Sequence, residues 1–201
     1  MEILIATGNP GKVREIAAIL NAPELTLLCL ADFPGLPRAE ERSRTYFENA
    51  LEKARLAAYH TGLPALADDS GLEVDALQGA PGIISARFAG PEADDKRNIE
   101  KLLRLISDIP EEDLQAKFVC VAVLVYQGRA YQAQGAIAGR IIKTPRGQNG
   151  FGYDPVFLLP ELGLTLAEID SELKNRISHR ARALLRLRPL LFHLAGIKPT
   201  S

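Results

Sequence analysis

The sequence predicts an α/β fold built on a mixed β-sheet with flanking helices. The chain opens with an apolar run of strand length, residues 2–6, followed by a glycine-rich turn and then by apolar residues at helical spacing. Residues 118–126 and 130–143 are rich in Val, Ile and Tyr and are separated by three residues, which predicts a long antiparallel hairpin. The 201 residues, 47% of them hydrophobic, suffice for one sizeable core and match the usual size of a single domain.

The amino-terminal quarter alternates between strands and helical or loop segments. Residues 8–11 are turn formers placed directly after the first strand. The helix that follows has an apolar face made of Val13, Ile16, Ala17 and Leu20. Residues 25–30 form a second apolar run of strand length, and residues 32–44 form a polar loop that carries Glu40 and Glu41.

A second helix is predicted to begin after Thr45. Thr45 and Glu48 form the Thr-x-x-Glu pattern of a capping box, in which each side chain satisfies an unpaired backbone donor at a helix start. Its expected buried face is Phe47, Ala50, Leu51, Ala54 and Ala58. Gly62 predicts the end of this helix. Residues 65–67 then indicate a short strand that leads directly into an Asp-Asp-Ser-Gly sequence at residues 68–71.

The remaining chain adds two loops and two helices to the predicted hairpin. Residues 79–90 contain clustered Gly and Pro and predict an ordered loop, whereas residues 94–106 regain helical spacing. A second glycine loop is expected at residues 144–154. The chain should close with a helix over residues 175–195 that Pro189 interrupts.

Charge and composition exclude several classes of partner. Lys and Arg total 24 against 25 Asp and Glu, a formal net charge of −1, so no positive field attracts nucleic acid. The longest apolar run, residues 118–126, is far shorter than the roughly 18 residues needed to span a bilayer. The opening apolar run is too short for a signal peptide, and Cys29 and Cys120 lack CxxC spacing. We therefore expect a cytoplasmic protein with no nucleic-acid or membrane partner.

The first candidate site lies between the opening strand and its helix and consists of Thr7, Gly8, Asn9, Pro10, Gly11 and Lys12. Glycines let the backbone approach an oxyanion, a helix N-terminus directs free N–H groups and partial positive charge outward, and Lys12 adds a full charge. This arrangement suits a polyphosphate, although the GxxxxGK[ST] spacing of a Walker A loop is absent. The alternative is a plain strand-to-helix turn with a solvated lysine.

The second candidate site is the acid pair Asp68 and Asp69 at the end of the short strand. Successive strand residues point to opposite faces, so only one of the two can readily serve a given site, and we favour Asp69. Carboxylates are the ligands that Mg²⁺ prefers, and Glu40 or Glu41 could supply a second one. The alternative is that Asp-Asp-Ser-Gly is only a turn, because these are natural turn residues.

The third candidate site interleaves aromatic residues with glycine and ends in an acid: Phe151, Gly152, Tyr153 and Asp154. An aromatic face beside closely approachable backbone makes a plausible platform for stacking a nucleobase. Asp154 could accept a hydrogen bond from a base or a ribose. Packing of both rings in a core is the alternative.

The fourth candidate site combines Lys174 with His179 and Arg180. The five-residue separation between Lys174 and His179 lets both face one cleft if a helix begins between them, and Arg180 offers a planar fork of donors. Such donors suit keto oxygens as well as phosphate. A solvated, charged helix start is the alternative.

Nucleophilic catalysis has little support in the sequence. Ser70 does not lie in a GxSxG elbow, and neither cysteine lies near a histidine in sequence, so no catalytic triad can be argued. The mechanism that remains is hydrolysis by water with the help of a bound metal. Hydrolysis of a phosphoanhydride needs a metal to offset phosphate charge and a base to orient water, which carboxylates beside a lysine-bearing glycine loop can supply.

Taken together, the four segments resemble the inosine triphosphate pyrophosphatases, also called XTP/dITP diphosphatases. The matching segments run in the family's order through ATGNPGKVREI, TYFENALEKARLAA, LPALADDSGLEVDALQGAPGIISARFAG, FGYDPVF and ISHRARAL. The resemblance implies hydrolysis of non-standard purine triphosphates such as ITP, dITP and XTP to a monophosphate and pyrophosphate, with Mg²⁺ as cofactor. It also implies an elongated mixed α/β fold over residues 1–201, with two lobes around a central cleft, and a homodimer.

The resemblance also implies roles for individual residues. The segment from Thr7 to Lys12 would hold the triphosphate, Asp69 would be the catalytic base and a metal ligand, and Ser70 would contact substrate. Glu40 would be the other metal ligand, and Lys53 would add a phosphate contact. The nucleoside would be bound and read by Phe151, Gly152, Tyr153, Asp154, Lys174, His179 and Arg180.

Two other functions compete with this interpretation. A Maf-like pyrophosphatase shares the reaction but prefers pyrimidine or modified nucleotides, and the ISHR segment argues for purines instead. A regulatory module would bind a triphosphate without cleaving it. Asp69 argues against the regulatory module, because an acid beside anionic phosphates contributes little to binding unless it holds a metal.

Overall fold

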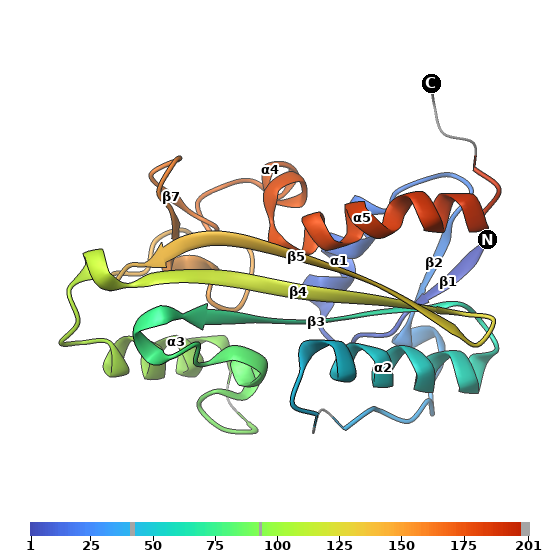
Figure 1. The fold of residues 1–201 in the computed structure, drawn as a ribbon, viewed down its shortest axis with the longest axis horizontal. Coiled ribbons are helices and arrows are strands. Elements are labelled where there is room, and N and C mark those ends of the chain that lie inside the picture. Colours follow the sequence, from blue (N-terminus) through green and yellow to red (C-terminus); the bar gives the residue numbers. More distant parts are fainter. Residues whose placement is uncertain (41–42, 93, 198–201) are drawn as a thin grey trace. The chain divides into compact units, whose positions relative to one another are not determined.

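The computed structural model describes residues 1–40, 43–92 and 94–197, and Figure 1 shows the path of the chain. The residues group into two compact units. The first unit contains Met1–Asp69, Cys120–Gly135 and the chain from His179 onward, and the second contains Ser70–Val119 and Ala136–Ser178.

One mixed sheet runs through the described part of the chain, with its seven strands in the order β2-β1-β3-β4-β5-β6-β7. The strands are β1 (Glu2–Ile5), β2 (Thr26–Cys29), β3 (Ala65–Val74), β4 (Gln115–Tyr126), β5 (Arg129–Ile141), β6 (Phe157–Leu159) and β7 (Leu164–Thr165). Strand β1 pairs in parallel with β2 and β3, whereas β6 pairs in antiparallel fashion with β5 and β7. The predicted mixed sheet with flanking helices is confirmed.

The hairpin between β4 and β5 turns within two residues. Gln127 and Gly128 have φ angles of 48° and 74°, so both occupy the left-handed region that a tight type I′ turn requires. Arg129, which sequence reasoning placed in the turn, already begins β5.

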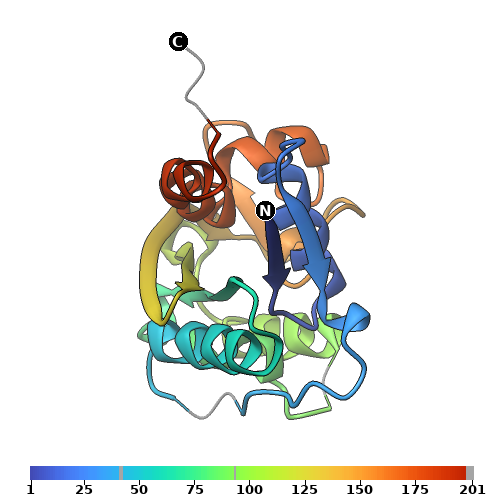
Figure 2. The ribbon, with the colours of Figure 1, turned by 90° about the vertical axis from the view of Figure 1, so that its right-hand side faces the viewer.

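In the first unit, helices cover both faces of the strands (Figure 2). These helices are α1 (Pro10–Ile19), α2 (Tyr46–Thr61) and α5 (His179–Leu194). Ile3 and Ile5 of β1 pack with residues of α1 and α5, whereas Leu4, between them in sequence, packs with alanines of α2. Alternation along β1 therefore sends neighbouring side chains into two different cores.

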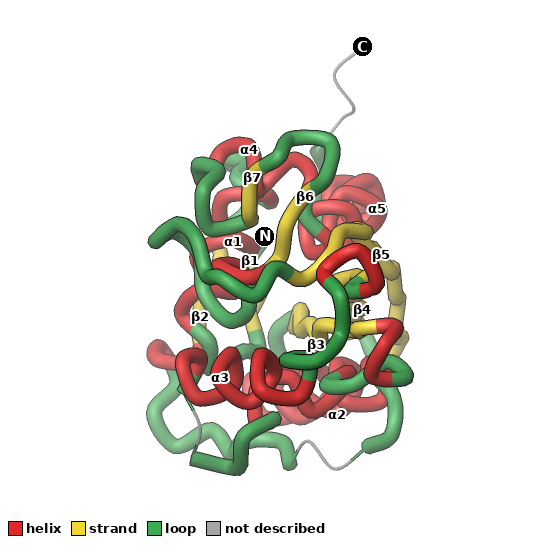
Figure 3. The backbone as a smooth tube through the Cα atoms, turned by 90° about the vertical axis from the view of Figure 1, so that its left-hand side faces the viewer, coloured by secondary structure: helices red, strands yellow, loops and turns green. Residues whose placement is uncertain are grey.

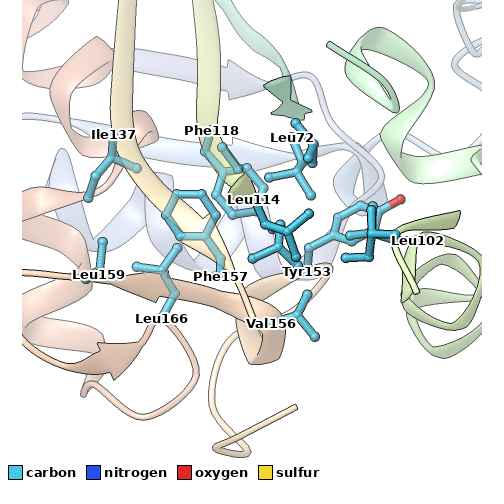
Figure 4. Close-up of a cluster of buried hydrophobic side chains, with 14 of the residues drawn as sticks. Leu72, Leu102, Leu114, Phe118, Ile137, Tyr153, Val156, Phe157, Leu159 and Leu166 are labelled. Atoms are coloured by element: carbon cyan, nitrogen blue, oxygen red, sulfur yellow. The ribbon is translucent and has the colours of Figure 1, made fainter. Parts of the chain in front are cut away.

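The second unit has its own core and contains α3 (Asp95–Leu105) and α4 (Ser171–Ile177), which can be followed in Figure 3 with β6 and β7. Figure 4 shows this core, in which the rings of Phe118 and Phe157 lie 4.7 Å apart between centroids. Short 3₁₀ helices occupy Leu30–Asp32, Asp75–Leu77, Gly82–Arg87, Glu111–Asp113 and Asp154–Val156. No described helix is long and apolar enough to cross a membrane.

The cap residues of α2 were predicted correctly. The Thr45 side chain accepts a hydrogen bond from the backbone N–H of Glu48 at 3.2 Å, and its hydroxyl donates to the Glu48 carboxylate at 3.0 Å. At the other end, Gly62 adopts φ 72°, the left-handed conformation in which glycine is favoured.

Further local predictions were wrong. Residues 82–87, expected in a loop, form a 3₁₀ helix. Strand β3 continues to Val74, so the acid pair lies inside a strand and not in a turn. The closing helix is two helices, α4 and α5, because Ser178 is extended at φ −64° and ψ 163°. Pro189 does not interrupt α5, whose Leu187 and Leu191 are buried on either side of it. Packing there outweighs the local penalty of an interior proline.

Candidate active site

The loop before α1 is organised by Asn9. As the N-cap residue, Asn9 accepts hydrogen bonds through Oδ1 from the backbone N–H groups of Gly11 and Lys12, at 2.8 and 3.2 Å. The side chain of Thr7 in turn accepts from the Asn9 N–H at 3.3 Å. A Cβ on Gly8 would meet nothing within 4 Å, so neither packing nor a positive φ explains glycine there.

Lys12 of this loop contacts a buried ion network in the first unit. Its ammonium lies 3.1 Å from Oδ2 of Asp68. The same oxygen accepts from Nε and Nη2 of Arg180 at 3.2 and 3.1 Å, and Nη1 of Arg180 binds the Glu15 carboxylate. Strand β3, helix α1 and helix α5 are therefore joined by charge as well as by apolar packing.

Asp68 and Arg180 of this network keep their charges despite burial. Burial raises the pKa of Asp68, but the charges of Lys12, Arg180 and Lys53 outweigh it and hold that pKa well below its usual range. Burial lowers the pKa of Arg180, whereas Asp68 and Glu15 raise it, with a net increase. Asp68 is therefore a carboxylate at any ordinary pH.

Cys120 contacts the same carboxylate and is unsuited to act as a nucleophile. Its sulfur lies 3.7 Å from Oδ2 of Asp68. Burial, followed by the charge of Asp68, raises the pKa of the Cys120 thiol far above its ordinary value. The thiol stays protonated, as expected for a buried cysteine of structural character.

Asp69 has different partners from Asp68. Its Oδ1 binds the Lys53 ammonium at 3.2 Å and its Oδ2 accepts from Nδ2 of Asn49 at 2.9 Å, both on α2. Asp68 contacts residues of α1 and α5, so the two acids serve different sets of residues, as strand alternation predicts. Asn49 was missed by sequence reasoning, although its position four residues before Lys53 on a predicted helix was a usable signal.

The second proposed metal ligand, Glu40, is exposed and precedes the gap at residues 41 and 42. Glu41, the alternative ligand, lies outside the described residues. Among the residues that the structure describes, no three His, Cys, Asp or Glu side chains gather as a metal-binding group. A metal at Asp69 would therefore need substrate oxygens and water to complete its coordination.

In the second unit, Asp154 and Lys174 form a buried ion pair beside Phe151. The Lys174 ammonium binds Oδ2 of Asp154 and lies 4.7 Å from the centroid of the Phe151 ring. Both charged residues are less than 5% exposed. The backbone N–H of Phe151 donates to the same Asp154 oxygen at 2.8 Å. A Cβ on Gly150 would lie 2.0 Å from that oxygen, so glycine is required there.

Tyr153 belongs to the core and not to a stacking platform. Its ring is packed in the cluster of Figure 4, and its hydroxyl donates to the backbone carbonyl of Ser85 at 2.9 Å. Burial and the charge of Asp95 raise the pKa of Tyr153. Of the two aromatics, Phe151 is only partly buried and remains a candidate for contact with a ligand. Gly152 is held by its N–H, which donates to the Asp95 carboxylate at 2.7 Å.

The remaining candidate residues divide between the two units. His179 and Arg180 begin α5 in the first unit, and both are nearly fully buried. Ser70 and Lys174 belong to the second unit. The N–H groups of Arg180 bind the carboxylates of Asp68 and Glu15, both in the first unit. The spacing of these residues in the sequence did not predict these contacts.

Comparison with known proteins gives consistent matches over nearly the whole chain. The chain is 51% identical over 187 residues to a dITP/XTP pyrophosphatase of Geobacter sulfurreducens, covering 92% of this chain and 94% of that protein. It is 50% identical over 201 residues to a dITP/XTP pyrophosphatase of Thioalkalivibrio sulfidiphilus, covering 98% and 100%. The structure of a HAM1 protein from Coxiella burnetii matches with a TM-score of 0.86 at 42% identity, covering 96% of this chain and 99% of that one. The family model described as the Ham1 family matches residues 3–190, and the chain therefore belongs to the Ham1 family.

Proposed function

We propose that this protein hydrolyses non-standard purine nucleoside triphosphates, namely dITP, XTP and ITP, to the monophosphate and pyrophosphate, and so removes them from the nucleotide pool. Two of the proteins named above, from Geobacter sulfurreducens and Thioalkalivibrio sulfidiphilus, are dITP/XTP pyrophosphatases. The observation that carries the proposal is the acid pair of β3, in which Asp68 contacts the lysine of the glycine loop and Asp69 contacts Lys53 and Asn49. Anion-binding and acidic groups thus occur together within one unit.

In this proposal the loop from Thr7 to Lys12 binds the triphosphate. The N-terminus of α1 and the Lys12 ammonium supply the positive charge, and Gly8 lets phosphate approach the backbone. Lys53 adds a further cation. Asp69 orients the attacking water and accepts its proton, with pyrophosphate as the leaving group.

Asp69 and Glu40 would hold Mg²⁺. The donor set fits, because both are carboxylates and Mg²⁺ commonly takes one or two carboxylates with phosphate oxygens and water completing the octahedron. The bound ion would neutralise charge on the phosphate oxygens. Removing Mg²⁺ with EDTA is expected to abolish turnover, and restoring it should recover the activity.

The purine would be bound by Phe151, Gly152 and Asp154, with Ser70 as a further substrate contact and Tyr153 supporting the loop from the core. Lys174 and His179 would donate to the 6-keto oxygen, whereas Arg180, whose donors bind Asp68 and Glu15, would hold the start of α5 in place. A site built to donate to a keto oxygen leaves buried polar groups unpaired when an amino group takes its place.

We therefore predict strong discrimination against adenine nucleotides. The kcat/KM for dITP and XTP should exceed that for dATP by about 100-fold or more. The measurement is pyrophosphate release from a panel of purine and pyrimidine triphosphates, each with and without Mg²⁺. Equal turnover of dATP and dITP would contradict the proposed base pocket.

The same panel separates the competing functions. A Maf-like enzyme would prefer pyrimidine or modified nucleotides, and a regulatory module would bind triphosphates and release no pyrophosphate. Neither is favoured by the Ham1 family match or by the relatives' names. The homodimer, the single two-lobed domain and the cytoplasmic location stay predictions, and sedimentation analysis tests the first.

A further inference from the structure

Asn49 places a fixed hydrogen-bond donor against the carboxylate on which the proposed reaction depends. The residue is 1% exposed, and its Nδ2 lies 2.9 Å from Oδ2 of Asp69. Its Oδ1 accepts the backbone N–H of Ser43 at 3.2 Å. Because a backbone N–H can only donate, it fixes the orientation of the amide, and the NH₂ group must face Asp69.

The local sequence does not otherwise favour asparagine at this position. The neighbouring buried residues of α2 are Ala50, Ala54 and Ala57, which suit both a helix and close packing on the sheet. Asparagine is a weaker helix former, and burial of its amide is unfavourable unless both ends are hydrogen-bonded. Natural sequences depart from local structural preference mainly at functional sites. Asn49 departs from it beside the proposed catalytic carboxylate.

Asn49 and Lys53 approach Asp69 together. They lie four residues apart on α2, so their side chains share one face of the helix, and each binds a different carboxylate oxygen. Asp68, by comparison, contacts two cations, Lys12 and Arg180. A neutral donor on Asp69 fixes the direction of the carboxylate without adding a second full positive charge.

We infer that Asn49 is a positioning residue for the reaction, which holds the Asp69 carboxylate in the orientation needed to direct water at the substrate. The inference rests on the proposed function, in which Asp69 is the base. The hydrogen bonds of Asn49 go to Asp69 and to the Ser43 backbone, so we assign it an effect through Asp69 and not on the nucleotide itself. Misplacement of a catalytic group by about 1 Å can cost on the order of 100-fold in rate. The loss should therefore fall on kcat and not on nucleotide binding.

The test uses Asn49→Asp and a matched control, Asn98→Asp. Asn98 is 2% exposed on α3; its Oδ1 accepts from the Ala89 N–H at 2.8 Å and its Nδ2 donates to the Ala86 carbonyl at 3.1 Å. Both substitutions preserve size and replace one buried NH₂ donor by an acceptor, but the hydrogen bonds of Asn98 go to the backbone of Ala86 and Ala89. Asn49→Ala is a second variant that keeps the helix and adds no charge.

The full-length chain would be assayed for pyrophosphate release from dITP at saturating Mg²⁺. Thermal melting checks folding, and calorimetry measures binding of α,β-imido-dITP, which cannot be cleaved. We expect both Asn49 variants to lose about 10- to 100-fold in kcat, with the KM and the dissociation constant of the analogue within about threefold of wild type. Asn98→Asp should melt earlier and keep the wild-type kcat.

Several outcomes would overturn the inference. These are wild-type kcat in a folded Asn49 variant, a loss confined to KM or to analogue binding, an equal loss of kcat in Asn98→Asp, or failure of both Asn49 variants to fold. If only Asn49→Asp fails to fold, the kcat of Asn49→Ala decides whether the inference holds. Failure of the proposed function is distinct, because the wild-type protein itself would then release no pyrophosphate from dITP.

Discussion

Replacing Asp69 with asparagine is expected to lower kcat for dITP hydrolysis by about 10²- to 10⁴-fold, the usual contribution of a general base. The amide has the same size as the carboxylate but can neither accept the proton of water nor hold Mg²⁺ as firmly. Asn49 keeps its place beside residue 69 but Lys53 loses its counter-charge, so the variant should melt earlier than wild type while still folding. Steady-state pyrophosphate release and circular dichroism measure the two effects.

Asp108→Asn is a suitable control for this prediction. Asp108 is an exposed aspartate after α3, and its substitution should leave both kcat and the melting temperature unchanged. Substantial turnover by folded Asp69→Asn would place the base elsewhere in the chain and would remove the main role proposed for β3.

Replacing Asp68 with asparagine is expected to act on stability. This carboxylate is fully buried and contacts both Lys12 and Arg180, so its loss leaves buried cations without their counter-charge. Removal of one partner from a buried ion pair typically costs about 3–5 kcal/mol. The free energy of unfolding, measured by urea denaturation, should fall by that amount.

Glu100→Gln is the matched control for Asp68→Asn. Glu100 pairs with Lys96 across one helical turn at 4.0 Å, and both side chains are well exposed. Such surface pairs contribute about 1 kcal/mol or less. Equal effects of the two substitutions would contradict the view that the Asp68 network stabilises the first unit.

The sequence predicted those parts of the fold that depend on local signals. The capping box at Thr45, the left-handed Gly62 and the Val-rich hairpin each lie within a few residues of the structure they specify. The extension of β3 through Asp68 and Asp69 was not predictable in this way. Aspartate is a poor strand former, and these two are accommodated by cations from distant segments.

The candidate site shows the same division between local and distant information. The glycine loop before α1 and its capping by Asn9 follow from adjacent residues. The contacts of Arg180 do not, because they join residues 112 and 165 positions apart. The alternation of aromatics with glycine also could not reveal that Tyr153 enters the core while Phe151 stays beside Lys174.

Product analysis tests the central claim most directly. The wild-type protein would be incubated with dITP and Mg²⁺ and followed by ³¹P nuclear magnetic resonance. Cleavage between the α and β phosphates should give dIMP and pyrophosphate in equal amounts. Release of orthophosphate with dIDP, or persistence of intact dITP, would contradict the account.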